Sequence, residues 1–183
     1  IEPSMKMHAD DLSGLLDHLG WNNVHLIGLV GMGCCVAQEI AINRPDLVRS
    51  MVNMGAWAYC DTYLYDQLKL FRDVHRDSGF LTFQEKVSIY SFLPEYYNEN
   101  RDKLLGPKAG WKELNGNYET HARLVEACIN HDVKDRLKEI SAPTLIIHAG
   151  KDLVTGPRTT LPIEQGIPNA EGVMMEDVAH VVA

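Results

Sequence analysis

Hydrophobic and polar positions follow two periods along the chain, and each period predicts one kind of element. Leucines recur over residues 7–19 at the i, i+3, i+4, i+7 spacing of an amphipathic helix, and Gly20 is placed to end it. Short apolar runs indicate strands buried on both faces of a parallel sheet. Further helices are predicted at Val36–Asn43 and around Leu161–Gly166. Strands alternating with helices are typical of a parallel α/β sheet. The predicted strands are Val24–Gly28, Leu47–Met54, Pro143–His148 and Gly172–Met175.

Residues 57–140 differ in character from the rest of the chain. Tyr, Trp, Leu and charged residues recur there at helical spacing, with breaks near Gly79, Pro94, Gly106–Pro107 and Gly116. A structureless connection of that length is uncommon in a compact domain, so we interpret the segment as about four inserted helices. The chain then divides into a first α/β part at residues 1–56, the insertion at 57–140 and a second α/β part at 141–183.

Length and charge narrow the class of protein. The 183 residues suit one soluble globular domain, and the net charge of −8 argues against a nucleic-acid or anionic-membrane partner. No apolar run approaches the length of a membrane span. The four cysteines show neither C-x-x-C nor zinc-finger spacing, so we expect reduced thiols in a cytoplasmic protein and no metal.

Four segments follow one another along the chain and cover most of it outside the insertion: LLDHLGWNNVHLIG, VAQEIAINRPDLVRSMV, ISAPTLIIHAGKDLVTGP and EDVAH. In this order they resemble the α/β-hydrolase superfamily in its cap-bearing form. The resemblance implies an α/β fold with a partial α/β-hydrolase parallel sheet, flanking helices, and residues 57–140 as a helical cap. The family has further strands ahead of these segments, so we expect a fragment, or a chain whose missing layers come from another subunit. An isolated copy would expose the edge of its first strand and tend to self-associate.

The resemblance also implies two catalytic positions. In this family a serine, an acid and a histidine follow strand ends in that chain order. Asp152 matches the acid and His180 the histidine, and the carboxylate would hold the imidazole in one tautomer. The alternatives are a turn aspartate that caps the following segment and a histidine that only packs. We interpret His148, His131 and His25 as packing residues.

The nucleophile turn, within Asn23–Ala37 (NVHLIGLVGMGCCVA), contains no serine. The family pattern is G-x-S-x-G. Alignment from the strand, with Gly28 as the first glycine, puts Val30 in the serine position, whereas alignment from the helix puts Gly31 there. We prefer Gly31, because the helix is the longer anchor and glycine relieves the strain of that position. The backbone amide of Met32 would then be the remaining oxyanion donor.

The turn allows two other interpretations. Cys35 lies in a small-x-Cys-x-small pattern and a thiolate is a strong nucleophile, but that choice would shift the turn and shorten the helix. Cys34 and Cys35 also fit small buried residues between helix and sheet.

The second interpretation is a phosphate-binding loop. Gly28, Gly31 and Gly33 have the spacing G-x-x-G-x-G, which differs from the dinucleotide fingerprint, and no Walker lysine follows. We therefore expect no cofactor.

Aromatic residues concentrate in the insertion, and the resemblance implies that some of them roof an apolar pocket. Trp57, Tyr96 and Tyr97 are our pocket candidates. The implied ligand is a small, partly apolar molecule with a carbonyl group. The resulting hypothesis is a hydrolase of ester-like or other carbonyl bonds, with water activated by His180 in place of a serine. The alternatives are a non-catalytic member that binds a small ligand or a partner, and a lyase that uses the His–Asp pair for proton transfer.

Overall fold

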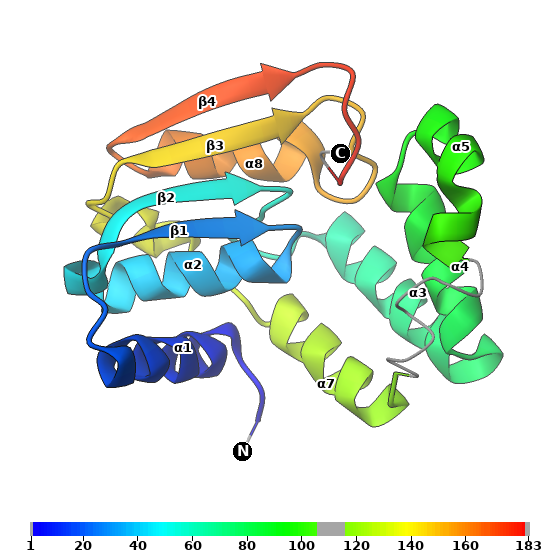
Figure 1. Ribbon diagram of the computed structural model, residues 1–183, viewed down its shortest axis with the longest axis horizontal. Coiled ribbons are helices and arrows are strands. Elements are labelled where there is room, and N and C mark those ends of the chain that lie inside the picture. The colour runs from blue at the N-terminus through cyan, green and yellow to red at the C-terminus, as the bar shows by residue number, and fades with distance from the viewer. Residues whose placement is uncertain (1, 106–115, 182–183) are drawn as a thin grey trace.

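A parallel β-sheet forms the centre of the molecule. The computed structural model describes residues 2–105 and 116–181. Within them the sheet has the order β1-β2-β3-β4, and each neighbouring pair is parallel (Figure 1). The α/β class with a parallel sheet is therefore confirmed, and each predicted strand has its counterpart with slightly shifted ends. The strands are β1 (Val24–Leu29), β2 (Val48–Met54), β3 (Thr144–Ala149) and β4 (Ala170–Met175).

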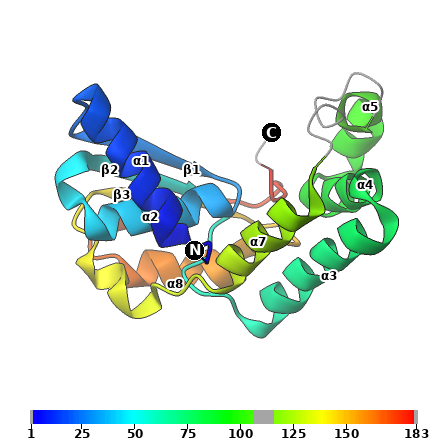
Figure 2. The same cartoon turned by 90° about the horizontal axis from the view of Figure 1, so that it is seen from below.

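In the part of the chain that the structure describes, three helices accompany the sheet. α2 (Met32–Asn43) and α8 (Gly156–Gly166) pack on the same face, and α1 (Met5–Leu19) packs against α2 (Figure 2). The Ser4 hydroxyl caps α1 by accepting the Met7 N–H at 3.1 Å, and Gly20 ends it at φ 67°. α2 begins at Met32 rather than at the predicted Val36, because the glycine turn leads directly into it. Short 3₁₀ turns at Pro45–Leu47 and Lys134–Glu139 precede β2 and β3.

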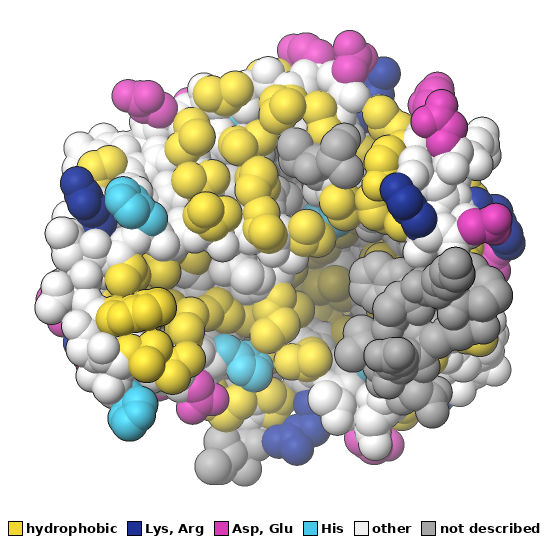
Figure 3. All heavy atoms as spheres, in the orientation of Figure 1, with side chains coloured by type: hydrophobic (Ala, Val, Ile, Leu, Met, Phe, Trp, Pro, Cys, Tyr) yellow, Lys and Arg dark blue, Asp and Glu magenta, His cyan; other side chains and the backbone are white. Residues whose placement is uncertain are grey.

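The two faces of the sheet differ in their surroundings. Met51 of β2 and Ile146 of β3 point into the core formed with α2 and α8, and both are buried. On the opposite face Ile27 and Leu29 of β1 are 65% and 55% exposed, and Val173 of β4 is 49% exposed. Figure 3 shows hydrophobic side chains gathered over the strands. Within the described residues this open face, with β1 at its edge, is a large apolar surface.

A group of helices lies between β2 and β3 in the chain. In the described residues this helical insert consists of α3 (Thr62–Ser78), α4 (Phe80–Ser91), α5 (Pro94–Leu105) and α7 (Tyr118–Ile129). Figure 1 places these helices beyond the carboxyl ends of the strands. The breaks predicted near Gly79, Pro94 and Gly116 fall at helix ends, whereas the break at Gly106–Pro107 lies outside the described residues. No helix in the described part has the length and apolar character required to cross a membrane.

Candidate active site

The turn between β1 and α2 is sharp and conformationally strained. Val30 has φ 48° and Gly31 has φ 68° and ψ −99°, and α2 starts at the next residue. A positive φ is a genuine outlier for a β-branched residue such as Val30, whereas glycine adopts it without steric cost. The Gly31 N–H donates to the Gly55 carbonyl at 2.9 Å, and the Val30 N–H donates to that of Met54 at 3.1 Å. Gly31 therefore occupies the position directly before the helix, with a backbone conformation that favours glycine.

Asp152 and His180 come together from two loops at the carboxyl edge of the sheet. Asp152 follows β3 and His180 follows β4. The His180 Nδ1 lies 2.9 Å from Oδ2 of Asp152, and both side chains are almost fully buried. A proton on Nδ1 makes this a hydrogen bond to the carboxylate and leaves Nε2 as the basic atom. In the described residues no hydrogen bond to a side chain or backbone group involves Nε2 of His180.

The carboxylate of Asp152 is held by several donors. The Thr155 hydroxyl donates to Oδ2 at 2.6 Å, and the backbone N–H groups of Val154 and Thr155 donate to Oδ1 at 2.7 and 2.9 Å. Burial by itself raises the pKa of Asp152, but the hydrogen bonds from His180 and Thr155 outweigh it and hold the pKa well below its usual range. Asp152 is consequently ionised at neutral pH and faces His180 as a carboxylate.

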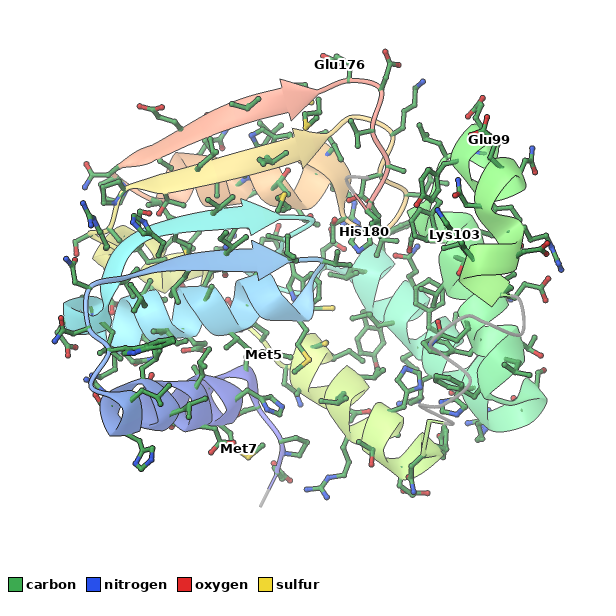
Figure 4. The ribbon with its side chains drawn as sticks, in the orientation of Figure 1. Met5, Met7, Glu99, Lys103, Glu176 and His180 are labelled. Carbon is green, nitrogen blue, oxygen red and sulfur yellow. The ribbon has the colours of Figure 1, made fainter. Side chains whose placement is uncertain are left out.

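Gly55 connects the turn to the histidine. Its φ is +65°, and a Cβ placed on it would lie only 3.0 Å from Cε1 of His180, so both the backbone conformation and the close approach favour glycine. The same residue accepts the hydrogen bond from Gly31. The Val181 N–H donates to the Ser91 carbonyl at 3.0 Å, which ties the histidine loop to the helical insert. Figure 4 shows His180 between the strand ends and the insert.

A cavity of about 220 Å³ lies beside this pair. The turn contributes Val30, Gly31 and Met32 to its wall, and Trp57 and His180 also line it. The rest of the wall is mostly apolar, which suits a small, partly apolar ligand. The lining residues from the helical insert are Leu68, Phe71, Phe83, Val87, Ser91, His121, Leu124, Val125 and Cys128.

The three pocket candidates from the sequence lie in three different places. Trp57 lines the cavity at His180 and is 3% exposed. Tyr97 lines a separate cavity of about 450 Å³ that also contacts Lys151. Tyr96 lines a smaller one, of about 70 Å³, beside the loop that carries His180. Neither tyrosine is among the described residues that line the His180 cavity.

Cys35 lies on the core side of α2. It is fully buried, its Sγ is 3.7 Å from the Trp57 carbonyl, and it is not among the described residues that line the cavity. Burial raises the pKa of the Cys35 thiol well above its usual value. Cys128 does line the cavity, but burial raises the pKa of its thiol to about 12. Neither environment favours a thiolate.

Three other histidines each have at least one ring nitrogen in contact with a residue away from the cavity. In β3 the His148 Nδ1 contacts Thr160 and its Nε2 contacts Glu164, each at 2.7 Å. The His131 Nε2 lies 3.3 Å from Oε1 of Gln38, and burial lowers the pKa of His131 to about 4. His25 is exposed on β1 and contacts Ser50. In the described parts of the chain no cluster of three His, Cys, Asp or Glu residues could hold a metal ion.

Sequence reasoning missed two residues that shape the site, Thr155 and Gly55. Thr155 has a local signal, because it follows Asp152 by three residues at the start of α8, where hydroxyl side chains commonly bond to nearby groups. Gly55 follows β2 and has the positive φ that glycine favours. The cavity residues His121, Ser91 and Cys128 have no such signal, because their places depend on how the insert packs.

A sharp strand–turn–helix, with an acid and a histidine on later strand ends of one parallel sheet, is the arrangement of an α/β hydrolase. The chain belongs to this family: the family model described as "alpha/beta hydrolase fold" matches residues 3–183. The predicted resemblance is thereby confirmed.

The individual proteins that the chain resembles have low sequence identity to it. The chain is 25% identical over 177 residues to "Putative carbamate hydrolase RutD" of Stutzerimonas stutzeri, covering 97% of this chain and 66% of the relative. The protein of the same name from Azorhizobium caulinodans is 24% identical, with 94% and 64% covered. The chain thus spans about two thirds of the length of these relatives.

Solved structures show the same fold. An α/β hydrolase, MGS-M2, from a Medee basin deep-sea metagenome library superimposes with a TM-score of 0.88 at 24% identity, covering 98% of this chain and 66% of that one. The enol-lactonase from Burkholderia xenovorans LB400 has a TM-score of 0.83 at 20% identity, with 96% and 65% covered.

Proposed function

We propose that this protein hydrolyses ester-like or other carbonyl bonds of a small, partly apolar substrate, with water as the nucleophile. The observation that carries the proposal is the buried His180–Asp152 pair beside an apolar cavity. Asp152 keeps the proton on Nδ1 of His180, so Nε2 takes a proton from water as the water oxygen bonds to the substrate carbonyl carbon. The proton then passes to the leaving alcohol or amine. Such a general base typically contributes about 10²–10⁴ in rate.

The amide of Met32 is the proposed donor to the oxyanion that forms in this reaction. Met32 is the first residue of α2 and lines the cavity, and the first N–H groups of a helix have no acceptor within the helix. The helix dipole also favours negative charge at this end. One such donor is typically worth about 10²–10³ in rate.

The names of related proteins support a carbonyl substrate. The sequence relatives are named carbamate hydrolases, and structural neighbours include an enol-lactonase and an esterase from Thermogutta terrifontis. All three names denote cleavage beside a carbonyl group.

The proposal extends to the helical insert, the location and the partners. We propose that the insert acts as a cap, because its side chains form most of the cavity wall. We also include a cytoplasmic location, because all four cysteines are free thiols, and no nucleic-acid partner, because the net charge is −8.

A protein that binds a ligand in the same cavity without reaction is the second candidate. One observation favours it: the Trp57 ring lies close over Gly31, the proposed nucleophile position, which carries no side chain. Turnover by the purified protein separates the two candidates.

The test is the initial rate of hydrolysis of short-chain aryl esters and aryl carbamates. His180→Ala is expected to lose at least about 10²-fold in rate, whereas Cys35→Ala retains the native rate. His25→Ala is the matched control for hydrolysis by an exposed imidazole, since His25 lies at the surface away from the cavity. Equal rates for the native protein and His180→Ala, or no turnover by either, would overturn the proposal and leave the binding function.

A further inference from the structure

The space above Gly31 is filled by another side chain. A Cβ placed on Gly31 would lie 2.7 Å from Cζ3 and 3.0 Å from Cη2 of Trp57. Carbon atoms in favourable contact are separated by about 3.5–4.0 Å. The six-membered edge of the indole therefore stands where the side chain of a nucleophile would begin. A hydroxymethyl group at position 31 and this ring cannot occupy the site together.

The backbone that carries Trp57 is fixed on both sides. The Trp57 carbonyl accepts from Nε2 of Gln38 at 3.2 Å and contacts the Cys35 thiol at 3.7 Å, and both donors lie on α2. The preceding carbonyl, that of Ala56, accepts from the hydroxyl of Thr159 on α8 at 2.8 Å. The next carbonyl, that of Ala58, accepts from the N–H of Val133 at 2.8 Å.

These contacts come from three separate segments, so the main chain at Trp57 has little freedom to shift. The indole is also buried, and apart from the cavity at one side its surroundings restrict its movement away from Gly31.

We propose that Trp57 and Gly31 form a matched pair in which the indole fills the space of a nucleophile side chain, so that no side chain at position 31 can form a covalent acyl intermediate while Trp57 is present. Restoring a serine at position 31 is then insufficient, because the ring blocks it. The inference rests on Gly31 being the nucleophile position of the proposed function, but not on turnover of any substrate.

The pair also restricts how a substrate lies in the cavity. The indole edge forms the wall at the turn, and Met32 and His180 line the same cavity. A substrate carbonyl group placed between Met32 and His180 would therefore lie near the indole edge.

The test is covalent labelling with an alkyl fluorophosphonate, read by intact mass and by peptide mass at position 31. In this reaction a hydroxyl oxygen bonds to phosphorus, the P–F bond breaks, fluoride leaves and His180 takes the hydroxyl proton. Gly31→Ser alone is expected to remain unlabelled at position 31. Gly31→Ser combined with Trp57→Ala is expected to gain an adduct there.

Control variants distinguish the effect of free space at position 31 from the effect of a hydroxyl group there. Gly31→Ala with Trp57→Ala has the room but no hydroxyl, and it gives no adduct at position 31. Gly31→Ser with Trp21→Ala removes an exposed tryptophan instead, and it stays unlabelled. Gly31→Ser with Trp57→Leu repeats the test with a milder loss of volume, and circular dichroism confirms that each variant is folded.

Labelling of Gly31→Ser alone at the rate of the double variant would overturn the inference. Folded double variants that stay unlabelled would overturn it too, because something other than Trp57 would then block the position. Full labelling after His180→Ala in the double variant would count against His180 as the base, and hence against the proposed function, while the role of Trp57 would stand.

Discussion

The Thr155 hydroxyl donates a 2.6 Å hydrogen bond to Oδ2 of Asp152, the same carboxylate oxygen that contacts His180. Thr155 thereby holds this carboxylate oxygen next to the imidazole. It also lies 3.2 Å from Nδ1 of His180, so one hydroxyl contacts both members of the pair. The position of the acid thus depends on a residue that the family motif does not contain.

Replacing Thr155 by Val is expected to weaken this arrangement. The change removes the hydroxyl but keeps the branched shape, so the carboxylate loses one charge-assisted hydrogen bond. We expect the free energy of unfolding to fall by about 1.5–3 kcal/mol, measured by urea denaturation. Thr155→Ser keeps the hydroxyl and serves as the control, with most of the stability retained. Equal stabilities of the two variants would show that the hydrogen bond contributes nothing.

Asp152 is expected to make stability depend on pH in the acidic range. Its pKa is lowered in the folded protein, so the folded state binds the proton less readily than the unfolded state does. The stabilisation is complete above the unfolded value of 3.8 and is lost as the pH falls below it toward the lower folded pKa. The slope for one proton is at most about 1.4 kcal/mol per pH unit.

Urea denaturation at a series of pH values below 5 measures this slope. Asp152→Asn cannot titrate at this position and should lack the contribution, although it is less stable at neutral pH. A variant with the same slope as the native protein would mean that the carboxylate titrates equally in both states.

His131 is expected to make stability depend on pH in a separate range, higher than that of Asp152. Burial lowers its pKa from 6.5 to about 4, so between these values the unfolded state binds a proton that the folded state does not. Stability from this group is therefore complete above pH 6.5 and is lost as the pH falls toward 4. The loss is about 3 kcal/mol. His121 has a lowered pKa too and adds to the same window.

The contribution of His131 is isolated by comparison with His131→Gln, whose side-chain amide can still donate to Gln38. The native protein should lose more stability than this variant between pH 6.5 and 4, as followed by urea denaturation. Parallel curves would show that His131 titrates normally in the folded protein.

The sequence predicted the sheet more completely than the site. Each strand is encoded locally, because an apolar run between turn residues is enough to indicate it. Asp152 and His180 follow phrases that resemble the family, and the structure brings the two together. The contact between Trp57 and Gly31 joins two turns that only the folded sheet places side by side, so no local pattern indicates it. Tyr96 was chosen because it lies near an element end, but which cavity it lines depends on how α5 packs.

Thiol reactivity tests whether a cysteine serves as the nucleophile. Cys60 is half-buried, whereas the other three cysteines are buried. Burial raises the pKa of Cys60 to about 11, those of Cys34 and Cys128 to about 12, and that of Cys35 well above its usual value. We therefore expect one slowly reacting thiol in the native protein, which Cys60→Ser abolishes, and reaction of all four after denaturation.

The measurement is titration with a thiol-specific chromogenic disulfide, followed by peptide mapping of the modified residue. Rapid modification of Cys35 in the folded protein would contradict the buried environment. It would also restore the hypothesis of a cysteine nucleophile.

The open apolar face of the sheet is expected to drive self-association. Ile27 and Leu29 are exposed on β1, which lies at the edge of the described sheet, and Val173 extends the apolar surface onto β4. An edge strand with an apolar face readily pairs with another copy. The combination of Ile27→Lys and Leu29→Lys places two charges on that surface and should shift the molar mass by light scattering toward the monomer. Binding of an apolar fluorescent dye should fall as well.

Leu81→Lys is the matched control, because Leu81 is nearly as exposed as Ile27 but lies on α4, away from the sheet. It should leave the association state unchanged, since a single added charge on the insert does not touch the apolar face. If the native protein is a monomer that binds no dye, the open face is covered in solution and the prediction is wrong. If Leu81→Lys dissociates the assembly as effectively as the β1 variant, copies associate through the helical insert instead.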